Sequence, residues 1–316
     1  MNALITGITG MVGSHFAQAC RAQGWRTQGI ARFSAASRQA AIDDPSVIRC
    51  DIIDARSLAN VFQKVQPDVV IHMAAQAFNG SSWSMENYTY QANVLGTLNV
   101  LQCAADYAPK AKVLLACSSA AYGDILPADC PLAEDRPLKP ITPYAVTKAA
   151  TEQIGYQYFR NFGLKVYLPR MFIHVGTGHP PATAIQNFAR QLALIAKGRL
   201  EPVMRVGNLE TARDFIDVRD GVAGMMCLLE KGAPGVPVNI CTGQAHSIRD
   251  TLNQLISASG LKVQVDSDVA LFRPTDEPLL LGDNSRLRQL GWQQCHTFDD
   301  TLAAVYADWL ERAERT

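Results

Sequence analysis

Tyr144 and Lys148 stand four residues apart, and Ser118 and Ser119 precede them at the end of an apolar run. Four residues make about one helical turn, so the tyrosine and lysine share one face of a helix. A phenol has a pKa near 10, and a nearby ammonium stabilises the phenolate and lowers that pKa. A serine hydroxyl then orients the reacting oxygen. Ser118, Tyr144 and Lys148 are therefore the candidate catalytic set, although such residues also occur on solvated helix faces and in turns.

A glycine-rich segment follows the first predicted strand. Gly7, Gly10 and Gly13 recur every third residue in TGITGMVG, directly before a predicted helix. A strand, a glycine-rich turn and a helix N-terminus together bind the diphosphate of a dinucleotide. We expect Gly7 to permit the tight turn, Gly10 to let the backbone approach the phosphates, and Gly13 to let the helix pack on the strand. The alternative is an ordinary flexible turn.

The residue that selects between NAD and NADP is expected about 20 residues beyond the last glycine. An acid there binds the 2′-hydroxyl of NAD, whereas an arginine favours the 2′-phosphate of NADP. Arg32 stands at this place, at the end of the second predicted strand. The prediction is NADP(H), with NAD(H) as the alternative, and Asp51 is expected at the adenine amino group. A solvated surface arginine is the other interpretation of Arg32.

Strands and helices alternate through the first two-thirds of the chain. Helices are predicted at 14–23, 57–65, 91–107 and 144–162, and strands at 3–6, 27–31, 47–50, 69–73, 113–118 and 166–172. This alternation, with nearly all-apolar strands, is typical of a parallel sheet covered on both faces. The predicted fold class is α/β, a Rossmann-type doubly wound parallel sheet with a smaller C-terminal α/β lobe.

The last third of the chain has a less regular order of predicted strands and helices. A Gly- and Pro-rich loop at 175–181 leads to helices predicted at 183–197, 247–258 and about 298–312, with strands at about 203–206, 215–218 and 238–241. We expect a dinucleotide-binding domain of residues 1–174 plus about 214–245. The substrate lobe is expected at about 175–213 and 246–300, followed by a C-terminal helix at 301–316.

Composition excludes several classes of protein. Of the 316 residues, 48% are hydrophobic, and 29 basic residues balance 29 acidic ones. The zero formal charge argues against nucleic-acid and membrane-surface binding. The eight cysteines form no CxxC pair, so we predict no metal site. No stretch reaches the roughly 20 apolar residues of a membrane span, and the N-terminus does not resemble a signal peptide. We expect a cytoplasmic protein.

Over essentially its whole length the chain resembles the extended short-chain dehydrogenase/reductase family. The segments that carry this resemblance are TGITGMVG, HMAAQ at 72–76, NVLGT at 93–97, SSAAYG at 118–123, YAVTK at 144–148 and LPRMF at 168–172. Two later segments, VGNLETARDFIDVRD at 206–220 and RPTDEPLLLGD at 273–283, are similar to GDP-mannose 4,6-dehydratases and GDP-6-deoxy-4-keto-D-mannose reductases. Arg213 and Arg273 match arginines that clamp the nucleotide diphosphate, unless they pair with Asp214, Asp217 or Asp276.

The resemblance implies two sets of binding residues. Those for the cofactor are Gly7, Gly10, Met11, Val12, Gly13, Arg32, Asp51, Ile52, Ala74, Ala75, Gln76, Asn93, Tyr144, Lys148 and Met171. Those for the substrate are Ser82, Ser119, Ala120, His174, Asn187, Val206, Asn208, Arg213, Arg273 and Asp276. It also implies a nucleotide diphosphate sugar, GDP-linked, as substrate, and a homodimer formed by helices 91–107 and 144–162.

The residue type at position 120 distinguishes the dehydratases of this family from enzymes with other reactions. The dehydratases carry a Glu two residues after the catalytic Ser or Thr, and this chain has Ala120 there. Without that carboxylate, elimination of water lacks its proton carrier. We therefore expect NADPH-dependent reduction of the C4 ketone of a nucleotide-linked 4-keto-6-deoxyhexose. The alternatives are a 4-epimerase, a 4,6-dehydratase or a non-catalytic NADP(H)-sensing protein. Ile173 replaces an Asn of the relatives that reaches the sugar nucleotide, and His174 could substitute for it.

Overall fold

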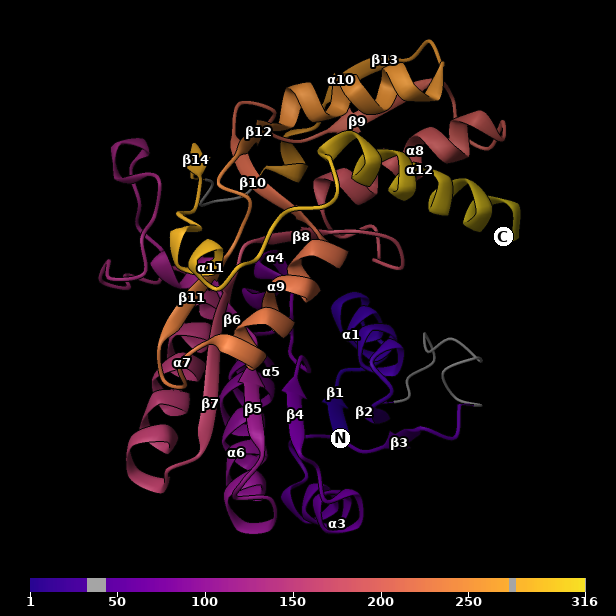
Figure 1. The fold of residues 1–316 in the computed structure, drawn as a ribbon. Coiled ribbons are helices and arrows are strands. Elements are labelled where there is room, and N and C mark those ends of the chain that lie inside the picture. Colours follow the sequence, from indigo (N-terminus) through magenta and orange to yellow (C-terminus); the bar gives the residue numbers. More distant parts are fainter. Residues whose placement is uncertain (33–43, 273–276, 316) are drawn as a thin grey trace.

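Parallel strands form the central sheet, in the order β11-β7-β5-β4-β1-β2-β3, with β6 beside β7. Figure 1 shows this arrangement in the computed structural model, which describes residues 1–32, 44–272 and 277–315. The chain crosses from one half of the sheet to the other between β1 and β4, where ligands of doubly wound folds bind. The strands are β1 (Asn2–Thr6), β2 (Arg26–Ala31), β3 (Val47–Arg49), β4 (Val69–His72), β5 (Lys112–Leu115), β6 (Cys117–Ser118), β7 (Lys165–Met171) and β11 (Pro237–Ile240).

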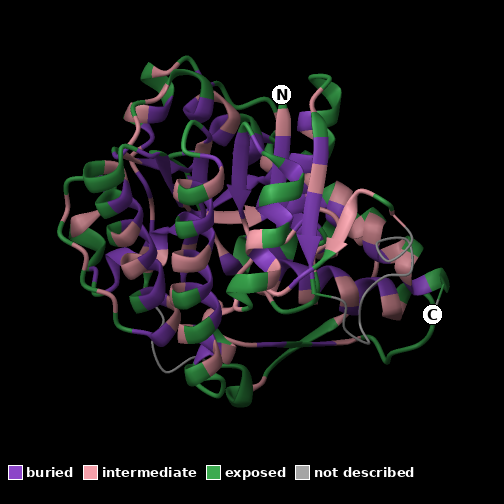
Figure 2. Cartoon of the chain, turned by 90° about the horizontal axis from the view of Figure 1, so that it is seen from below, coloured by how far each residue is buried: buried purple, intermediate pink, exposed green. Residues whose placement is uncertain are grey.

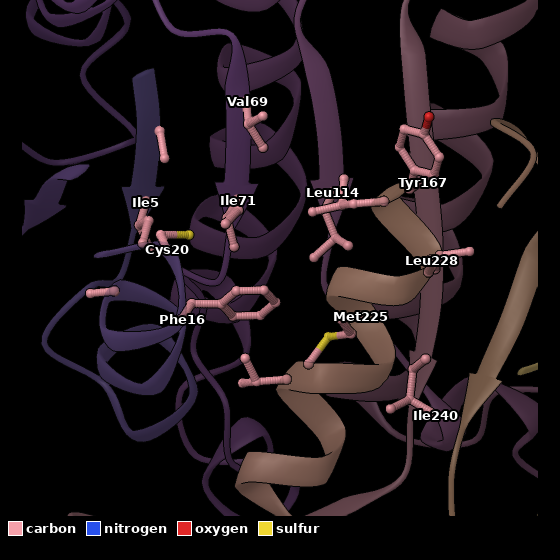
Figure 3. Packing of buried hydrophobic residues seen from close by; sticks show 14 of the residues in the cluster. Ile5, Phe16, Cys20, Val69, Ile71, Leu114, Tyr167, Met225, Leu228 and Ile240 are labelled. Atoms are coloured by element: carbon pink, nitrogen blue, oxygen red, sulfur yellow. The ribbon is translucent and has the colours of Figure 1, made fainter. Parts of the chain in front are cut away.

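The central strands are buried on both faces because successive side chains point to opposite sides. On β1, Ala3 and Ile5 belong to one hydrophobic cluster and Leu4 to the other. Leu114 on β5 likewise faces the first cluster, and Leu115 the second. Figure 3 shows the first cluster, in which Phe16 and Met225 from two helices meet Ile71 and Tyr167 from the sheet.

Helices cover both faces of this sheet. The first face is covered by α1 (Met11–Ala22), α9 (Val218–Lys231) and α11 (Ser285–Gln289), and the second by α3 (Ala55–Val65), α6 (Gly96–Tyr107) and α7 (Pro143–Phe162). Short helical segments lie between them, at α4 (Asn79–Ser82), α5 (Glu86–Tyr90), η1 (Gln91–Leu95), η2 (Ser119–Tyr122) and η3 (Pro127–Asp129). Figure 2 shows the resulting pattern of buried strands and exposed outer helix faces.

A second lobe lies at the carboxyl end of the central strands (Figure 1). Its strands form two small sheets, one of β12, β10 and β14 with β8 beside β10, and one of β13 and β9. A hydrophobic cluster including Phe188, Leu252 and Trp309 joins its helices. The elements are β8 (Ile173–Val175), α8 (Ala184–Ala196), β9 (Val203–Val206), β10 (Ala212–Asp217), β12 (Ala245–Ser247), α10 (Ile248–Ser259), β13 (Gln264–Ser267), η4 (Val269–Leu271), β14 (Leu279–Leu280) and α12 (Phe298–Arg315).

The structure divides the chain differently from the expected boundaries in three places. β10, expected in the dinucleotide-binding domain, pairs instead with β8, β12 and β14. α11 and Trp292, expected in the lobe, pack into the core of the first sheet face. α12, expected as a separate C-terminal helix, buries Leu302, Val305 and Trp309 against α8 and α10. Each difference arises because these elements pack against elements that are distant in the sequence. The periodicity of a single segment does not reveal such contacts.

The strand predicted at 113–118 is interrupted at Ala116. β5 pairs with β4 and β7, whereas β6 pairs with β7 alone among the described strands. The Ala116 N–H donates to the His72 carbonyl oxygen at 3.1 Å, but its own carbonyl accepts from the Lys148 ammonium at 2.7 Å. The Lys148 side chain, from α7, therefore takes the place of a sheet partner. None of the described helices is long and apolar enough to cross a membrane.

Candidate active site

The glycine loop between β1 and α1 has the tight geometry that a dinucleotide requires. Gly7 adopts φ +70°, and a Cβ there would lie 2.8 Å from the backbone nitrogen of Ala74. A Cβ on Gly13 would lie 2.2 Å from the Gly7 carbonyl oxygen. Gly10 caps α1, whose first turn holds no acidic residue. These residues fit a dinucleotide diphosphate, because the backbone can approach closely and the helix N-terminus favours an anion.

Ser118, Tyr144 and Lys148 meet at the carboxyl end of β6 and the start of α7. Burial raises the pKa of Tyr144, and a side-chain hydrogen bond with Ser118 offsets part of that effect. The Lys148 ammonium lies 5.7 Å from the centroid of the Tyr144 ring. Burial lowers the pKa of Lys148 to about 8. The three residues that could share a proton with a substrate therefore lie within one cluster.

The expectation that Lys148 brings the pKa of Tyr144 below its ordinary value was wrong, because the net shift is upward. Its ammonium donates to the Ala116 carbonyl and lies over the tyrosine ring, so desolvation of the phenolate dominates. The phenol consequently stays protonated at neutral pH. A protonated phenol is the form that can donate a proton to a carbonyl oxygen.

Helix α7 is held in place at the residues around the catalytic pair. The Thr142 hydroxyl caps the helix by accepting from the Ala145 N–H, and Pro143 occupies the first turn. The Asn93 amide, from η1, donates to the Thr147 hydroxyl at 3.0 Å. Thr147 lies between Tyr144 and Lys148, so this bond ties the reacting turn of α7 to the adjacent helix.

A large cavity of about 1030 Å³ opens over these residues, between the central sheet and the second lobe. Most of the predicted site residues line it. The predicted lining residues are Gly7, Gly10, Met11, Val12, Gly13, Arg32, Asp51, Ile52, Ala74, Ala75, Ser118, Ser119, Ala120, Tyr144, Lys148, Met171, His174, Asn208 and Arg213. One cavity thus brings together the glycine loop, the candidate catalytic set and Arg213, although these are far apart in the sequence. Their roles stay predictions.

Two predicted cofactor residues, Gln76 and Asn93, do not line the cavity. The Gln76 N–H donates to the Asn93 side chain at 2.8 Å, and the Asn93 amide donates back to the Gln76 carbonyl at 3.0 Å. Both residues are buried. These two hydrogen bonds join the loop after β4 to η1, so the two residues stabilise the elements next to the cavity without lining it.

Three predicted substrate residues also lie off the cavity. The Ser82 hydroxyl is buried and donates to the Asn79 carbonyl. Val206 packs into the core of the second lobe. Asn187, on α8, does not contribute to the cavity wall either. Arg273 and Asp276 lie outside the described residues.

Arg213 lines the cavity with a partner that the sequence did not indicate. Its guanidinium donates to the carbonyl oxygens of Ala212 and Glu277, at 2.9 and 2.6 Å, and lies 3.8 Å from the Glu277 carboxylate. Asp214 instead accepts from the Thr242 N–H at 2.9 Å and from its hydroxyl at 2.7 Å. Two backbone carbonyls therefore fix the orientation of a buried cation on the cavity wall.

His174 occupies a more enclosed position than a ligand-binding residue would need. Its Nδ1 lies 2.9 Å from the Phe172 carbonyl oxygen and so must carry the proton of that bond. Its Nε2 is buried without a hydrogen-bond partner in the described part of the chain. A Cβ on Gly221 would lie 2.2 Å from that atom, which therefore faces α9. This favours a structural role for His174 over replacement of the missing amide.

Several aromatic residues that line the cavity were not predicted from the sequence. Trp83 and Tyr88 come from the segment after β4, Phe172 follows β7, and Phe272 follows η4. Phe78 and His179 also line the cavity, and their rings meet edge to face at 5.7 Å. No spacing signal marks such residues, because loops bring them to the cavity from separate places.

Comparisons with known proteins agree with this arrangement. The family model described as GDP-mannose 4,6 dehydratase matches residues 4–305. The GDP-6-deoxy-D-mannose reductase of Pseudomonas aeruginosa is 30% identical over 98% of this chain and 97% of its own length. A GDP-mannose 4,6-dehydratase of Vibrio cholerae is 28% identical, with 99% and 95% covered. The solved structure of RMD from Pseudomonas aeruginosa complexed with NADPH superposes with a TM-score of 0.86 at 29% identity, covering 99% and 100% of the two chains.

These matches cover almost the whole chain and include both lobes. The superposition agrees with the α/β fold and its parallel sheet described above. The chain therefore belongs to the GDP-mannose 4,6 dehydratase family, a group of extended short-chain dehydrogenases/reductases that are enzymes acting on nucleotide sugars.

Proposed function

We propose that this enzyme reduces the C4 ketone of a nucleotide-linked 4-keto-6-deoxyhexose with NADPH, and that the nucleotide is GDP. The observation that carries the proposal is the composition of the cavity around Ser118. A protonated Tyr144 and a buried Lys148 lie beside it, and Ala120 occupies the place of the dehydratase carboxylate. These groups suffice for adding one proton to a ketone oxygen, but they lack a carboxylate to remove water from C5 and C6.

The cofactor and the protein side chains divide the chemistry. When bound along the glycine loop, NADPH supplies the hydride that C4 receives. Ser118 donates a hydrogen bond to the ketone oxygen, and Tyr144 transfers its proton to that oxygen, so the product is an alcohol. Lys148 has three N–H donors, of which Ala116 accepts one. We assign the others to the nicotinamide ribose and to the negative charge that develops on the Tyr144 oxygen as its proton leaves. Burial outweighs this interaction before the transfer, so the pKa of the phenol is raised overall.

Arg32 and Arg213 support the choice of ligands. Arg32 lies at the end of β2 on the cavity wall, where a guanidinium suits a 2′-phosphate. Arg213 lies on the second lobe, where a planar cation suits the diphosphate of a sugar nucleotide. The similarity to the Pseudomonas aeruginosa reductase, and the NADPH in the RMD structure, agree with both assignments.

The second candidate reaction is 4,6-dehydration. The family model and the Vibrio cholerae relative favour it by similarity, whereas Ala120 argues against it. A 4-epimerase would use the same catalytic residues without net redox change. The proposed reduction is tested with purified enzyme, NADPH and GDP-4-keto-6-deoxymannose. NADPH consumption equal to the ketone consumed supports it. Conversion of GDP-mannose to a keto sugar, or epimerisation of a GDP- or UDP-hexose without NADPH loss, would replace it.

We also propose a homodimer formed through the outer faces of the helices around α6 and α7. Leu95 is 50% exposed, and Val146 and Tyr156 on α7 are 37% and 45% exposed. Large apolar side chains exposed on neighbouring helices suit a self-association surface. Light scattering should give twice the mass of the chain, and a monomer at micromolar concentration would contradict this part of the proposal.

A further inference from the structure

We propose that Tyr88 is a positioning residue for cofactor selection, whose ring holds the Arg32 guanidinium in the orientation that binds the 2′-phosphate of NADP(H). This inference rests on the proposed use of NADP(H). It adds a determinant from α5, outside the glycine loop and the end of β2. Three residues are involved, and they are far apart in the sequence: Arg32, Asp51 and Tyr88. All three line the cavity.

The contact between Arg32 and Tyr88 is a cation–π interaction. The Arg32 Cζ atom lies 5.2 Å from the centroid of the Tyr88 ring, within the roughly 6 Å range of such contacts. The Arg32 side chain is 55% exposed, whereas Tyr88 is half-buried in the cavity wall. The ring is therefore the more fixed partner, and it provides a surface for a long side chain that otherwise extends into solvent.

The neighbouring carboxylate does not hold Arg32 as firmly. The distance from Arg32 Nη1 to Asp51 Oδ2 is 3.9 Å, which is longer than a hydrogen bond. The other oxygen of Asp51 accepts the Ile53 N–H at 3.0 Å. An exposed ion pair of that length contributes little to fixing a side chain. The contact with the Tyr88 ring is thus the one that best restricts where the guanidinium lies.

Stacking and phosphate binding use different parts of the guanidinium. The ring of Tyr88 engages its face, whereas a phosphate accepts hydrogen bonds from the N–H groups at its edge. Both contacts can therefore exist together. If the ring is removed, Arg32 samples more rotamers, and binding the phosphate must then order them at a cost in entropy. That cost weakens the binding of NADPH but not the binding of NADH, which has no 2′-phosphate.

The experiment measures equilibrium binding of NADPH and NADH to the full-length protein. The variants are Tyr88→Leu, Tyr88→Phe, Arg32→Ala, Arg32→Lys and the double variant Tyr88→Leu/Arg32→Ala. We expect Tyr88→Leu to weaken NADPH binding about three- to tenfold, the range of a cation–π contact, and NADH binding less than about twofold. Tyr88→Phe should restore the wild-type affinity ratio. Arg32→Lys keeps the charge without the planar face, so it should lose NADPH affinity even if Tyr88→Leu folds poorly.

The double variant is the decisive comparison. Once Arg32 is Ala, the Tyr88→Leu change should have no further effect on NADPH binding. Equal losses for NADPH and NADH would overturn the proposal, because Tyr88 would then act on the part that both cofactors share. Additive losses in the double variant, or equal affinities of the wild type for the two cofactors, would overturn it as well. These measurements need no sugar, so this binding pattern in a protein that fails to reduce the keto sugar would overturn only the proposed reaction.

Discussion

The Lys148 ammonium donates a 2.7 Å hydrogen bond to the carbonyl oxygen of Ala116, at the interruption between β5 and β6. A backbone carbonyl that would otherwise pair within the sheet thus fixes the Lys148 side chain, the lysine of the candidate catalytic set. The same interruption places Ser118 at the end of the short strand β6, beside Tyr144. Local departure from a regular strand therefore assembles the candidate catalytic cluster.

Replacing Tyr144 with Phe should remove turnover and leave cofactor binding nearly unchanged. The ring and its packing stay, but the proton donor is lost, and such donors contribute about 10²- to 10⁴-fold to rate. Steady-state NADPH oxidation and NADPH binding measure the two effects. Tyr306→Phe on α12 is the matched control, because that tyrosine packs in the second lobe away from the cavity. Turnover of Tyr144→Phe at the wild-type rate would refute the assigned role.

The activity should decline on the basic side near pH 8. Burial lowers the pKa of Lys148 to about 8, so the free enzyme loses the ammonium as pH rises through that value. The pKa of Tyr144 is raised, so the phenol keeps its proton through this range. The quantity to measure is kcat/KM for NADPH, because it reports ionisations of the free enzyme. A profile that stays flat to pH 10 would show that the charge of Lys148 is not required.

Replacing Arg213 with Ala should weaken the binding of the sugar nucleotide more than the binding of the cofactor. Charge-assisted hydrogen bonds to phosphate contribute about 1.5–3 kcal/mol, which predicts an increase of roughly tenfold to a hundredfold in KM for the keto sugar. The KM for NADPH should change little. Arg219→Ala is the matched control, because that arginine binds Asp217 and does not line the cavity. Equal increases for both substrates would contradict a diphosphate-binding role.

Acid should destabilise the fold through two histidines. Burial, with the nearby Lys148 charge, lowers the pKa of His72 to about 3, and burial lowers the pKa of His174 to about 4. Unfolded histidines titrate near 6.5. Between these values the unfolded chain binds more protons than the folded one. Stability is therefore complete above about pH 6.5 and is lost as pH falls toward 4.

The hydrogen bonds around His72 explain why it stays neutral. The Thr97 hydroxyl donates its only proton to the Asn93 carbonyl at 2.5 Å, so it must accept from His72 Nε2 at 3.0 Å. His72 Nδ1 then accepts from the Thr6 hydroxyl at 2.7 Å. Urea unfolding should show a loss of about 2 kcal/mol per histidine between pH 7.5 and pH 5. Equal free energies of unfolding at the two pH values would contradict this.

The central sheet could be predicted from the sequence, and the candidate catalytic residues could be selected from it, because both signals are local. A glycine spacing, a run of apolar residues or a pair such as Tyr144 and Lys148 is readable within one element. The short strands β8, β12 and β14 were missed because two or three residues carry no periodic pattern. The strand partners of β10 could not be predicted for a related reason, since long stretches of chain separate it from β12 and β14.

The same limit applies within the candidate site. Gln76 and Asn93 were predicted at the cofactor, yet the Asn93 side-chain amide bonds the backbone N–H and carbonyl of Gln76, and residue type does not reveal which polar group an amide faces. Tyr88 was not singled out at all, because a tyrosine in the segment SSWSMENYTYQ at 81–91 has no signature before the fold brings Arg32 over its ring. Contacts between distant elements decide both cases.

The most direct test of the central claim is hydride transfer to C4, followed with NADPH that carries deuterium at both positions of the nicotinamide C4. The enzyme is incubated with this cofactor and GDP-4-keto-6-deoxymannose, and the product sugar is examined by mass spectrometry and NMR. Our account predicts one deuterium at C4 of the product for each cofactor oxidised, and none with Tyr144→Phe. A product without deuterium at C4, or a changed sugar without cofactor oxidation, would contradict it.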